Sequence, residues 1–340
     1  MFSIDLVHQG TLHTVPAGGC FAAPREAGFR DTPAAELREL IGEVEAGRAW
    51  REALAARYEG SKNWLYRIVA DPSRTAFFGP VLPEGGGVVL DIGSGWGQIA
   101  RPLATKRPVV ALEPVAERLA FVRAAARQEG IHDRMAFVES DYFEVEFTTR
   151  FSVICAIGVL EWAGAFQGTA DAQERQRAFL GKTRNELAAG GSLILGIENR
   201  LGLKYLLGCP DDHIGVPHIA CLPADLARRR WQEAGGHRLQ SFTYSSTELE
   251  AMLRAAGFTT VEFFAAFPDY KLPQRILSLA DGGRALNRQL REGPFPPDHN
   301  GYDGSRLDPG LLDVLGAHYQ SLAAEGIAHH FVPSFFVRAG

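Results

Sequence analysis

The stretch VVLDIGSGWG, residues 88–97, decides the fold of this chain. It opens with an apolar run, ends in three glycines spaced G-x-G-x-G, and leads into a helical pattern that begins near Gln98. Glycine lets the backbone turn sharply and approach a ligand with no Cβ in the way. A strand, a glycine-rich turn and a helix in this order predict a ligand-binding turn of an open α/β sheet.

Short apolar runs alternate with helical stretches on both sides of this turn. Helices are expected at Glu117–Arg127 and Gln173–Leu187, and the capping box of Ser245 and Glu248 predicts another. Most apolar runs are continuous, as expected of central strands with helices on both faces. We predict an α/β fold with a doubly wound, seven-stranded, Rossmann-like sheet. Its strands are expected at Val88–Ile92, Val109–Glu113, Ala136–Glu139, Phe151–Ile157, Ser192–Ile197, Thr260–Phe264 and Phe331–Val337.

The chain is predicted to divide into an N-terminal helical extension, residues 1–80, and a sheet domain, residues 81–340. Helices of the extension are expected at Thr32–Tyr58 and Asn63–Ala70. The sheet domain carries two insertions, residues 199–244 and 268–330, that are rich in Gly, Pro, His and aromatic residues. Loops this long usually form functional caps. The first insertion leaves the carboxyl end of a strand and is the predicted source of a substrate pocket.

Composition argues against several classes of protein. The formal net charge is −5 and the basic residues are scattered, whereas proteins that grip nucleic acid show a basic face. We therefore expect no nucleic-acid partner. The chain has no run of about 18 uncharged apolar residues and no secretory pattern at its start, so no membrane association is expected. The four cysteines form no C-x-x-C pair, which indicates a reduced, cytoplasmic protein.

Polar residues follow the next two strands at the positions where a cofactor would lie. Glu113 ends the second strand about 20 residues after Gly93, and its carboxylate can accept hydrogen bonds from two ribose hydroxyls. Asp141 and Tyr142 follow the third strand, where either side chain can meet an adenine edge. NAD also carries a ribose, but its glycine fingerprint is G-x-G-x-x-G and cradles a pyrophosphate. The G-x-G-x-G spacing therefore favours S-adenosylmethionine, which has no phosphate.

With these residues, the chain resembles the class I S-adenosylmethionine-dependent methyltransferases over about residues 81–337. The resemblance implies that the glycine loop touches the methionine part of the cofactor, that Glu113 holds the ribose, and that Asp141 and Tyr142 approach adenine. It also implies that backbone atoms near Gly158 face the cofactor's amino group. The loop residues that match the family's pattern are Asp91, Gly93, Gly95 and Gly97.

A narrower resemblance covers the second half of the chain. Four strings in the same order are similar to one methyltransferase group whose members accompany glycosyltransferases in polysaccharide clusters or occur in natural-product pathways. The strings are IGVLEWAGAF (157–166), IENRLGLKYLLG (197–208), PDDHIG (210–215) and FPDYKLP (267–273). They indicate a lineage and leave the methyl acceptor open.

Two residues are predicted to be catalytic. Methyl transfer is an in-line displacement, so the protein must align the nucleophile and, for a hydroxyl acceptor, remove its proton. Glu161 lies just past the fourth strand and is a candidate base or orienter, with a structural ion pair as the alternative. His213 lies in the shared PDDHIG string and is the candidate histidine base, with loop-structuring hydrogen bonds as the alternative.

Five further side chains are candidates for contact with the acceptor. Trp162 and Tyr205 are candidate pocket walls, with packing as the favoured alternative, and Tyr270 can reach the pocket from the end of a strand. Asn199 and Arg200 end the fifth strand, and Arg200 is a candidate clamp for a carboxylate or phosphate, with a loop-holding salt bridge as the alternative.

A metal centre is not predicted. Asp211, Asp212, His213 and His218 carry metal-ligand side chains, but their spacing matches no recognised site.

The resulting hypothesis is a methyltransferase that methylates an oxygen or nitrogen atom of a small-molecule or saccharide-linked acceptor. A sulfur atom as the methyl acceptor is a further possibility. The alternatives are a catalytically silent module that binds S-adenosylmethionine and an NAD-dependent dehydrogenase. The oligomeric state is also left open, a homodimer included.

Overall fold

The computed structural model describes residues 2–23, 29–166, 168, 171–293 and 309–340. The chain forms two compact units, each made of separate segments. Unit 1 comprises Met1–Thr75, Pro83–Ile157 and Asn185–Leu193, and unit 2 comprises Ala76–Leu82, Gly158–Arg184 and Ile194–Gly340.

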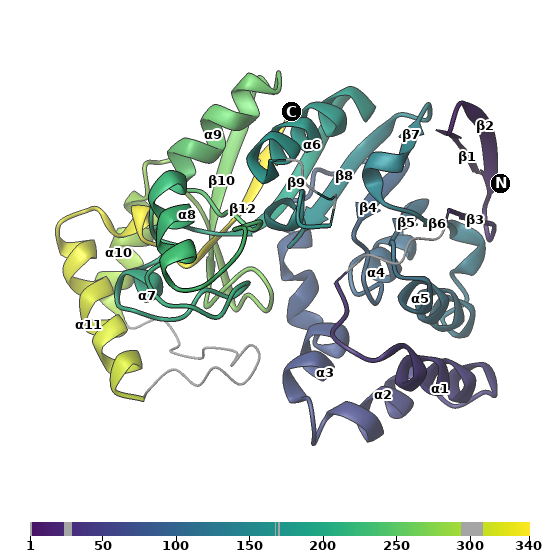
Figure 1. The fold of residues 1–340 in the computed structure, drawn as a ribbon, viewed down its shortest axis with the longest axis horizontal. Coiled ribbons are helices and arrows are strands. Elements are labelled where there is room, and N and C mark those ends of the chain that lie inside the picture. Colours follow the sequence, from purple (N-terminus) through teal and green to yellow (C-terminus); the bar gives the residue numbers. More distant parts are fainter. Residues whose placement is uncertain (1, 24–28, 167, 169–170, 294–308) are drawn as a thin grey trace. The chain divides into compact units, whose positions relative to one another are not determined.

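Unit 1 contains a parallel sheet built from the apolar runs around the glycine-rich turn (Figure 1). Its strands are β3 (Cys20–Ala22), β4 (Val89–Ile92), β5 (Val109–Leu112), β6 (Met135–Glu139) and β8 (Phe151–Ile157), in the order β8-β4-β5-β6-β3. Leu90 of β4 pairs with Val110 of β5 and Ile154 of β8. Every residue of β4 and β5 is buried, because both faces of these strands are covered.

The N-terminal segment of unit 1 begins with strands, which the predicted helical extension over residues 1–80 did not include. β1 (Ser3–His8) and β2 (Thr11–Pro16) form a hairpin, and β7 (Val145–Phe147) completes a separate three-stranded sheet. The hairpin turn is Gln9-Gly10, and both residues have positive φ, 48° and 77°. This turn type matches the twist of paired strands and favours glycine.

The predicted helix at Thr32–Tyr58 is two helices, α1 (Ala34–Glu45) and α2 (Trp50–Tyr58). The chain turns between them at Gly47, whose φ of 101° no helix contains. α3 (Asn63–Ala70) follows as predicted, and unit 1 also contains α4 (Ala100–Ala104) and α5 (Ala116–Gln128). The first three helices share one apolar core with α5. Its largest members include Leu40, Trp50, Leu54, Tyr58, Leu65, Trp96 and Phe121.

Strand β9 (Leu187–Glu198) belongs to both units, since the division falls after Leu193. In unit 2 the strand order is β9-β12-β10-β11, with β10 (Val261–Phe267), β11 (Arg275–Ser278) and β12 (Ser334–Ala339). β10 runs antiparallel to both of its neighbours. β12 begins three residues later than predicted, directly after Pro333, which has no N–H to donate to a strand ladder.

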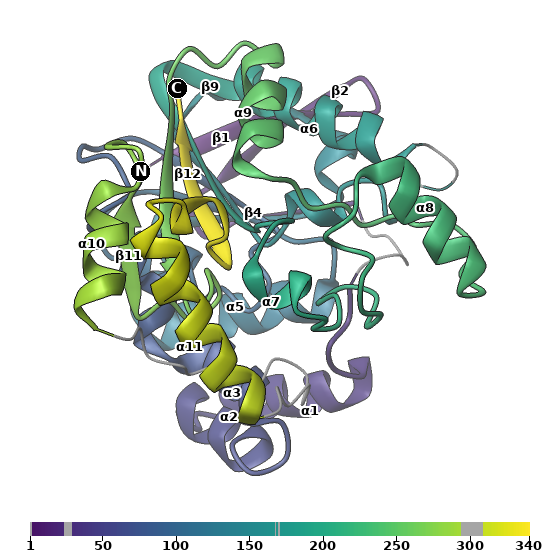
Figure 2. The same cartoon turned by 90° about the vertical axis from the view of Figure 1, so that its left-hand side faces the viewer.

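The helices of unit 2 are α6 (Ala172–Glu186, whose last two residues fall in unit 1), α7 (Leu203–Leu206), α8 (Ala224–Glu233), α9 (Ser246–Ala255), α10 (Arg284–Glu292) and α11 (Pro309–Ala324). The predicted capping box is confirmed, because Ser245 and Glu248 exchange both hydrogen bonds at the start of α9. Figure 2 shows α10 and α11 side by side.

The predicted α/β fold with a Rossmann-like sheet is confirmed. All seven predicted strands form, and β3 and β11 are additional. The predicted insertion 199–244 contains α7 and α8, and the described part of the insertion 268–330 contains β11, α10 and α11. Residues 294–308 of the second insertion lie outside the described residues. Among the helices described, none has the length and apolarity that crossing a membrane requires.

Candidate active site

The glycine-rich turn lies in unit 1 between β4 and α4. Gly93, Gly95 and Gly97 all have positive φ, between 55° and 75°. This backbone conformation strains any residue with a Cβ. At Gly97 a Cβ would also lie 2.8 Å from a methyl of Val122, so the glycine allows the turn to pack on α5. The turn therefore needs glycine for its shape and leaves the backbone open to a ligand.

Glu113 follows β5 and contacts this turn directly. Its carboxylate accepts hydrogen bonds from the Gly95 N–H at 2.9 Å and the Val115 N–H at 3.1 Å. The side chain is 3% exposed, and burial raises the pKa of the carboxyl group while the nearby Arg118 opposes the rise. The predicted proximity of Glu113 to the glycine turn is thus present in the structure.

Asp91 is the charged residue inside β4. It is buried, and burial raises its pKa to about 7 against the opposing effects of Arg74 and the Ala100 N–H. Its Oδ2 has no hydrogen-bond partner among the residues that the structure describes.

Asp141 and Tyr142 follow β6 as predicted and start a 3₁₀ turn, Tyr142–Glu144. The Asp141 carboxylate caps this turn by accepting the Phe143 N–H at 2.8 Å. The Tyr142 hydroxyl donates to the carboxylate of Glu186 at 2.6 Å, and both of these residues are buried.

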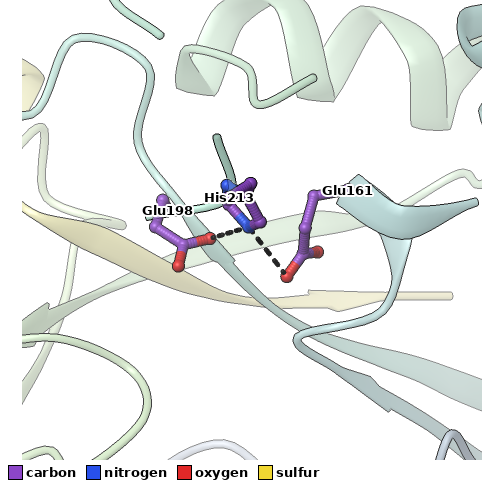
Figure 3. Close-up of side chains that lie close together, drawn as sticks. All are labelled: Glu161, Glu198 and His213. Carbon is purple, nitrogen blue, oxygen red and sulfur yellow. Dashed lines mark ion pairs between the residues drawn. The ribbon is translucent and has the colours of Figure 1, made fainter. Parts of the chain in front are cut away.

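A second group of polar residues lies within unit 2, around the imidazole of His213 (Figure 3). Glu161 stands in the 3₁₀ turn Leu160–Trp162 that follows β8, and Glu198 is the last residue of β9. The Nε2 atom of His213 lies 3.8 Å from Glu161 Oε1 and 3.7 Å from Glu198 Oε2. Both glutamates are fully buried, and the His213 side chain is 5% exposed.

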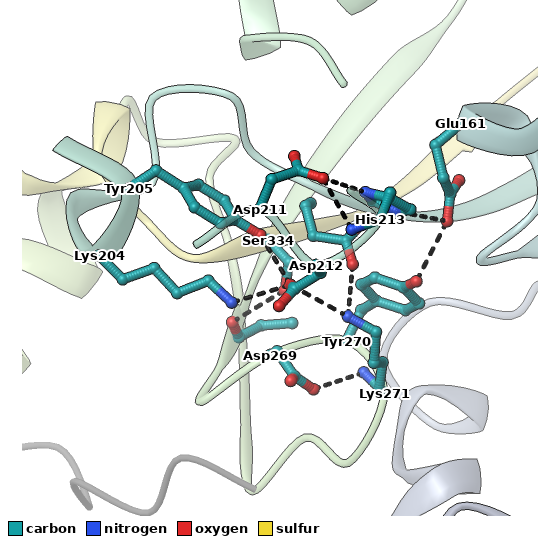
Figure 4. Close-up of polar contacts among 12 residues, drawn as sticks. Glu161, Lys204, Tyr205, Asp211, Asp212, His213, Asp269, Tyr270, Lys271 and Ser334 are labelled. Carbon is teal, nitrogen blue, oxygen red and sulfur yellow. Dashed lines mark hydrogen bonds and ion pairs between the residues drawn. The ribbon is translucent and has the colours of Figure 1, made fainter. Parts of the chain in front are cut away.

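Two more residues hold these groups in place. Asp211 accepts the backbone N–H groups of His213 and Ile214 at 2.7 and 2.8 Å, and its Oδ1 lies 3.5 Å from His213 Nδ1. The Tyr270 hydroxyl donates to Glu161 Oε1 at 3.3 Å (Figure 4). The imidazole is thus oriented on one side by Asp211 and faces two carboxylates on the other.

The same group continues into a network of ion pairs centred on Asp212. Asp212 Oδ2 accepts from Lys204 Nζ at 2.9 Å, from the Tyr205 hydroxyl at 2.7 Å and from Lys271 Nζ at 3.4 Å. Lys271 also donates to Glu198 Oε1, which joins the network to the His213 carboxylates. We call the whole set, Glu161, Glu198, Lys204, Tyr205, Asp211, Asp212, His213, Tyr270 and Lys271, the charged cluster.

Comparison with known proteins places the glycine turn in a family. The family described as "Methyltransferase domain" matches residues 89–178, which include the turn, Glu113 and Asp141. Residues 89–178 therefore form part of a methyltransferase domain. S-adenosylmethionine is the cofactor of this domain, as the glycine spacing predicts.

A curated relative, ribosomal RNA small subunit methyltransferase G of Kineococcus radiotolerans, is 30% identical over 141 residues. The match covers 41% of the present chain and 52% of the relative, so it spans about half the length of that protein. That relative is named for ribosomal RNA, so the expectation that the present methyltransferase has no nucleic-acid partner stays a prediction.

Solved structures similar to the methyltransferase include the cyclopropane synthase MmaA2 of Mycobacterium tuberculosis, with 18% identity, a TM-score of 0.46, and coverage of 85% of this chain and 98% of that chain. Another is an S-adenosylmethionine-dependent methyltransferase of Geobacter sulfurreducens in complex with S-adenosyl-L-homocysteine. It shows 16% identity, a TM-score of 0.43, and coverage of 92% of this chain and 98% of that chain.

Burial sets the electrostatics of the charged cluster. Burial alone would lower the pKa of His213, but Glu198, Asp211 and Glu161 together raise it well above its usual range. Burial raises the pKa of Glu161, which His213 partly offsets. Burial also tends to raise the pKa of Asp212, yet Lys204 and Lys271 hold it well below its usual range. The cluster is thus a set of mutually dependent charges in a site with little access to water.

The structure brings some predicted acceptor residues into the charged cluster. Tyr205 and Tyr270 belong to it, and the Trp162 ring packs edge-on against His213 with centroids 5.0 Å apart. The other two side chains are engaged by the fold. Asn199 donates to the carbonyls of His330 and Val332. Arg200 makes a two-point ion pair with Glu248 at 2.9 and 3.0 Å and donates to the Cys221 carbonyl, which is the loop-holding alternative.

Glu198 and Lys204 were not predicted from the sequence, and Lys271 had no predicted role. The available signal was that each is a charged residue inside one of the strings that resemble the methyltransferase group. Glu198 also ends an apolar run, a place where charges in α/β sheets tend to face a ligand crevice.

Proposed function

We propose that this methyltransferase transfers a methyl group to an oxygen or nitrogen, with sulfur left open, of a small-molecule or saccharide-linked acceptor. The bound cofactor supplies a methyl group on a sulfonium that is already a good leaving group. The protein's own tasks are therefore to hold the cofactor, to align the acceptor and to promote the loss of the acceptor's proton.

Unit 1 supplies the cofactor-binding residues of this proposal. The turn at Gly93, Gly95 and Gly97 would receive the methionine part, since its positive-φ glycines leave no Cβ in the way. Glu113 would exchange its backbone partners for ribose hydroxyls. The remaining proposed contacts of unit 1 are Asp91 beneath the turn and Asp141 and Tyr142 toward adenine. The backbone of Gly158, which belongs to unit 2, is the proposed contact for the amino group.

Unit 2 supplies the proposed catalytic residues. The observation that carries this assignment is the convergence of two fully buried carboxylates on the His213 imidazole. A buried glutamate is costly unless it is paired or functional. We assign to Glu161 and His213 the binding of the acceptor's reacting group and the promotion of its proton loss. Trp162 and Tyr270, which contact His213 and Glu161, would line the acceptor site.

A smaller role in acceptor binding is proposed for Asn199, Arg200 and Tyr205. Their polar groups are already bound within unit 2, by backbone carbonyls, Glu248 and Asp212 respectively. Any contribution to acceptor binding would therefore come through the loops that they hold.

The acceptor class is tested with cofactor that carries a deuterated methyl group. The protein is incubated separately with saccharide extracts, small-molecule extracts and ribosomal RNA, and each product is searched by mass spectrometry for the mass increment. Label in the saccharide or small-molecule fraction supports the proposal. Label confined to RNA overturns the acceptor class. Cofactor binding without label in any fraction favours the catalytically silent alternative.

The catalytic assignment is tested by Glu161→Gln and His213→Gln. Loss of positioned proton transfer typically lowers turnover by about 10²–10⁴-fold. We expect such a loss with unchanged affinity for S-adenosylhomocysteine, measured by calorimetry. The control is Glu250→Gln, the same chemical change at an exposed residue of α9, which should retain full turnover. Normal turnover in both cluster variants would remove these residues from catalysis.

A further inference from the structure

We propose that Glu161, Glu198 and His213 form a binding site for one divalent metal ion of the Mn²⁺ or Zn²⁺ type. Each residue offers one ligand atom, and the three atoms lie within 4.8 Å of one another. All three residues belong to unit 2. Imidazole nitrogen combined with carboxylate oxygen is a donor set that suits these ions.

The spacing of the three groups fits a shared ion better than direct hydrogen bonds. His213 Nε2 lies 3.8 Å from Glu161 Oε1 and 3.7 Å from Glu198 Oε2. Hydrogen bonds between such atoms are about 2.7–3.2 Å long. Two ligands of one ion, each bound at about 2.0–2.4 Å, lie roughly 3–4 Å apart. The groups are therefore close without bonding, and the separation suits an ion among them.

The carboxylates also present buried oxygens that accept no hydrogen bond from the described part of the chain. Glu161 Oε2 and Glu198 Oε2 have no hydrogen-bond partner among the described residues, and both side chains are fully buried. Glu198 Oε2 is the atom that faces the imidazole. Buried polar atoms are almost always partnered, by protein, water or an ion.

The surroundings of the three side chains resemble those of metal ligands. A histidine ligand usually has a carboxylate on its other ring nitrogen, and ligating carboxylates are themselves hydrogen-bonded. Asp211 Oδ1 faces His213 Nδ1 at 3.5 Å, which leaves Nε2 directed at the two glutamates. Tyr270 donates to Glu161 and Lys271 donates to Glu198, each through Oε1.

The acidic side chains of the charged cluster outnumber its ammonium groups, which favours binding of a cation. Its ion pairs join the carboxylates of Glu161, Glu198, Asp211 and Asp212 to the ammonium groups of Lys204 and Lys271 and to His213. A histidine that ligates a metal is neutral. Four acidic side chains then face two ammonium groups, and this excess of acidic groups favours a bound cation.

The metal-ligand residues considered from the sequence were a different set. Asp212 forms ion pairs with Lys204 and Lys271. Of the four residues considered from the sequence, only His213 belongs to the proposed metal site. The actual three residues are separated by many positions along the chain, so no local spacing motif announces them.

The inference stands apart from the proposed function, because ion binding is measured without cofactor or acceptor. The two are compatible, since a bound divalent ion lowers the pKa of a hydroxyl that it coordinates and so promotes proton loss. If methyl transfer continues in the presence of a chelator, the ion is not needed for transfer. The titration then decides by itself whether the three residues bind an ion.

The test is a titration of the full chain after chelator treatment and desalting. Mn²⁺ binding is followed by the loss of the free-ion electron paramagnetic resonance signal, and Zn²⁺ binding by competition. We expect one ion per chain. Glu198→Gln and His213→Gln should each weaken binding at least tenfold, whereas the exposed control Glu250→Gln should bind as the unmodified protein does. Binding of S-adenosylhomocysteine by each variant shows that unit 1 remains folded.

A measurement on the unmodified protein covers the case in which the variants do not fold. Bound Mn²⁺ should show pulsed-resonance coupling to an imidazole nitrogen, because His213 is a ligand. Absence of binding of both ions at millimolar concentration would overturn the proposal. Binding without nitrogen coupling, or binding retained in both cluster variants, would overturn it as well.

Discussion

The glycine turn of unit 1 and the charged cluster of unit 2 are built in different ways. The turn comes from consecutive residues, and its shape depends on backbone conformations that glycine permits. The cluster comes from residues between Glu161 and Lys271, and its shape depends on side chains that meet only in the fold. The glycine turn is therefore determined by residues that are adjacent in the sequence, whereas the charged cluster forms only when the chain folds.

The two regions also satisfy their buried charges differently. Glu113 accepts hydrogen bonds from two backbone N–H groups, which a ligand can replace, and its neighbour Arg118 keeps a second acidic partner in Asp31. In the cluster, Lys271 serves both Glu198 and Asp212, so removing one charge strands others. We therefore expect changes at the turn to act mainly on cofactor affinity, and changes in the cluster to act on stability and turnover together.

The largest stability effect is expected for Lys271→Met. Breaking a buried ion pair by removing one partner typically costs about 3–5 kcal/mol, because an uncompensated charge remains. The free energy of unfolding, measured with urea in metal-free buffer, should fall by this amount. Lys106→Met, at an exposed lysine, is the control and should change stability little. A loss below about 1 kcal/mol for Lys271→Met would show that the cluster's charges are independent of one another.

The next effect depends on pH and concerns Asp91. Its pKa in the folded protein is raised from 3.8 to about 7, so the folded state holds its proton longer than the unfolded state does. The stability that this proton provides is full below pH 3.8 and is lost as the pH rises toward 7. A shift of this size corresponds to about 4 kcal/mol.

Asp91→Asn cannot ionise, so its stability relative to the unmodified protein should increase between pH 4 and pH 7 by up to about 4 kcal/mol. Urea unfolding at several pH values measures the difference. A difference that stays constant over this range would mean that Asp91 is ionised in the folded protein at low pH.

A smaller effect is expected at the turn for Glu113→Ala. Loss of hydrogen bonds to a buried carboxylate is worth about 1.5–3 kcal/mol, which corresponds to more than tenfold in affinity. Calorimetric titration with S-adenosylhomocysteine measures it. Glu117→Ala, at a neighbouring acid that pairs with Arg30 and Arg38, is the matched control and should bind normally. Unchanged affinity for Glu113→Ala would exclude Glu113 from the cofactor site.

The smallest effect is expected for Arg200→Gln. Its ion-pair partner Glu248 is 42% exposed, so loss of the pair should cost roughly 1 kcal/mol. Because the guanidinium is already engaged, the KM for the acceptor should change less than twofold. A KM increase of tenfold or more, with unchanged stability, would instead make Arg200 a clamp for the acceptor.

Prediction from the sequence succeeded where local chemistry decides the structure. The strands around Val89–Ile92 were predictable because continuous apolar runs have few alternatives to burial between two layers. The start of α9 was predictable because its capping box is local. The hairpin at β1 and β2 was missed because both strands are only six residues long and β2 is largely exposed. The break at Gly47 was missed because a single glycine does not by itself end a helix.

The sequence by itself determined the sheet, the glycine turn and the position of Glu113, because strand burial and positive φ depend on residues close together in the chain. Only the tertiary structure decided which charged residues meet. It placed Glu198 beside His213 and paired Arg200 with Glu248. It also buried Lys271 between Glu198 and Asp212. The reason is physical: a long charged side chain is stable in water or in a buried pair, and only the folded chain shows which partner is within reach.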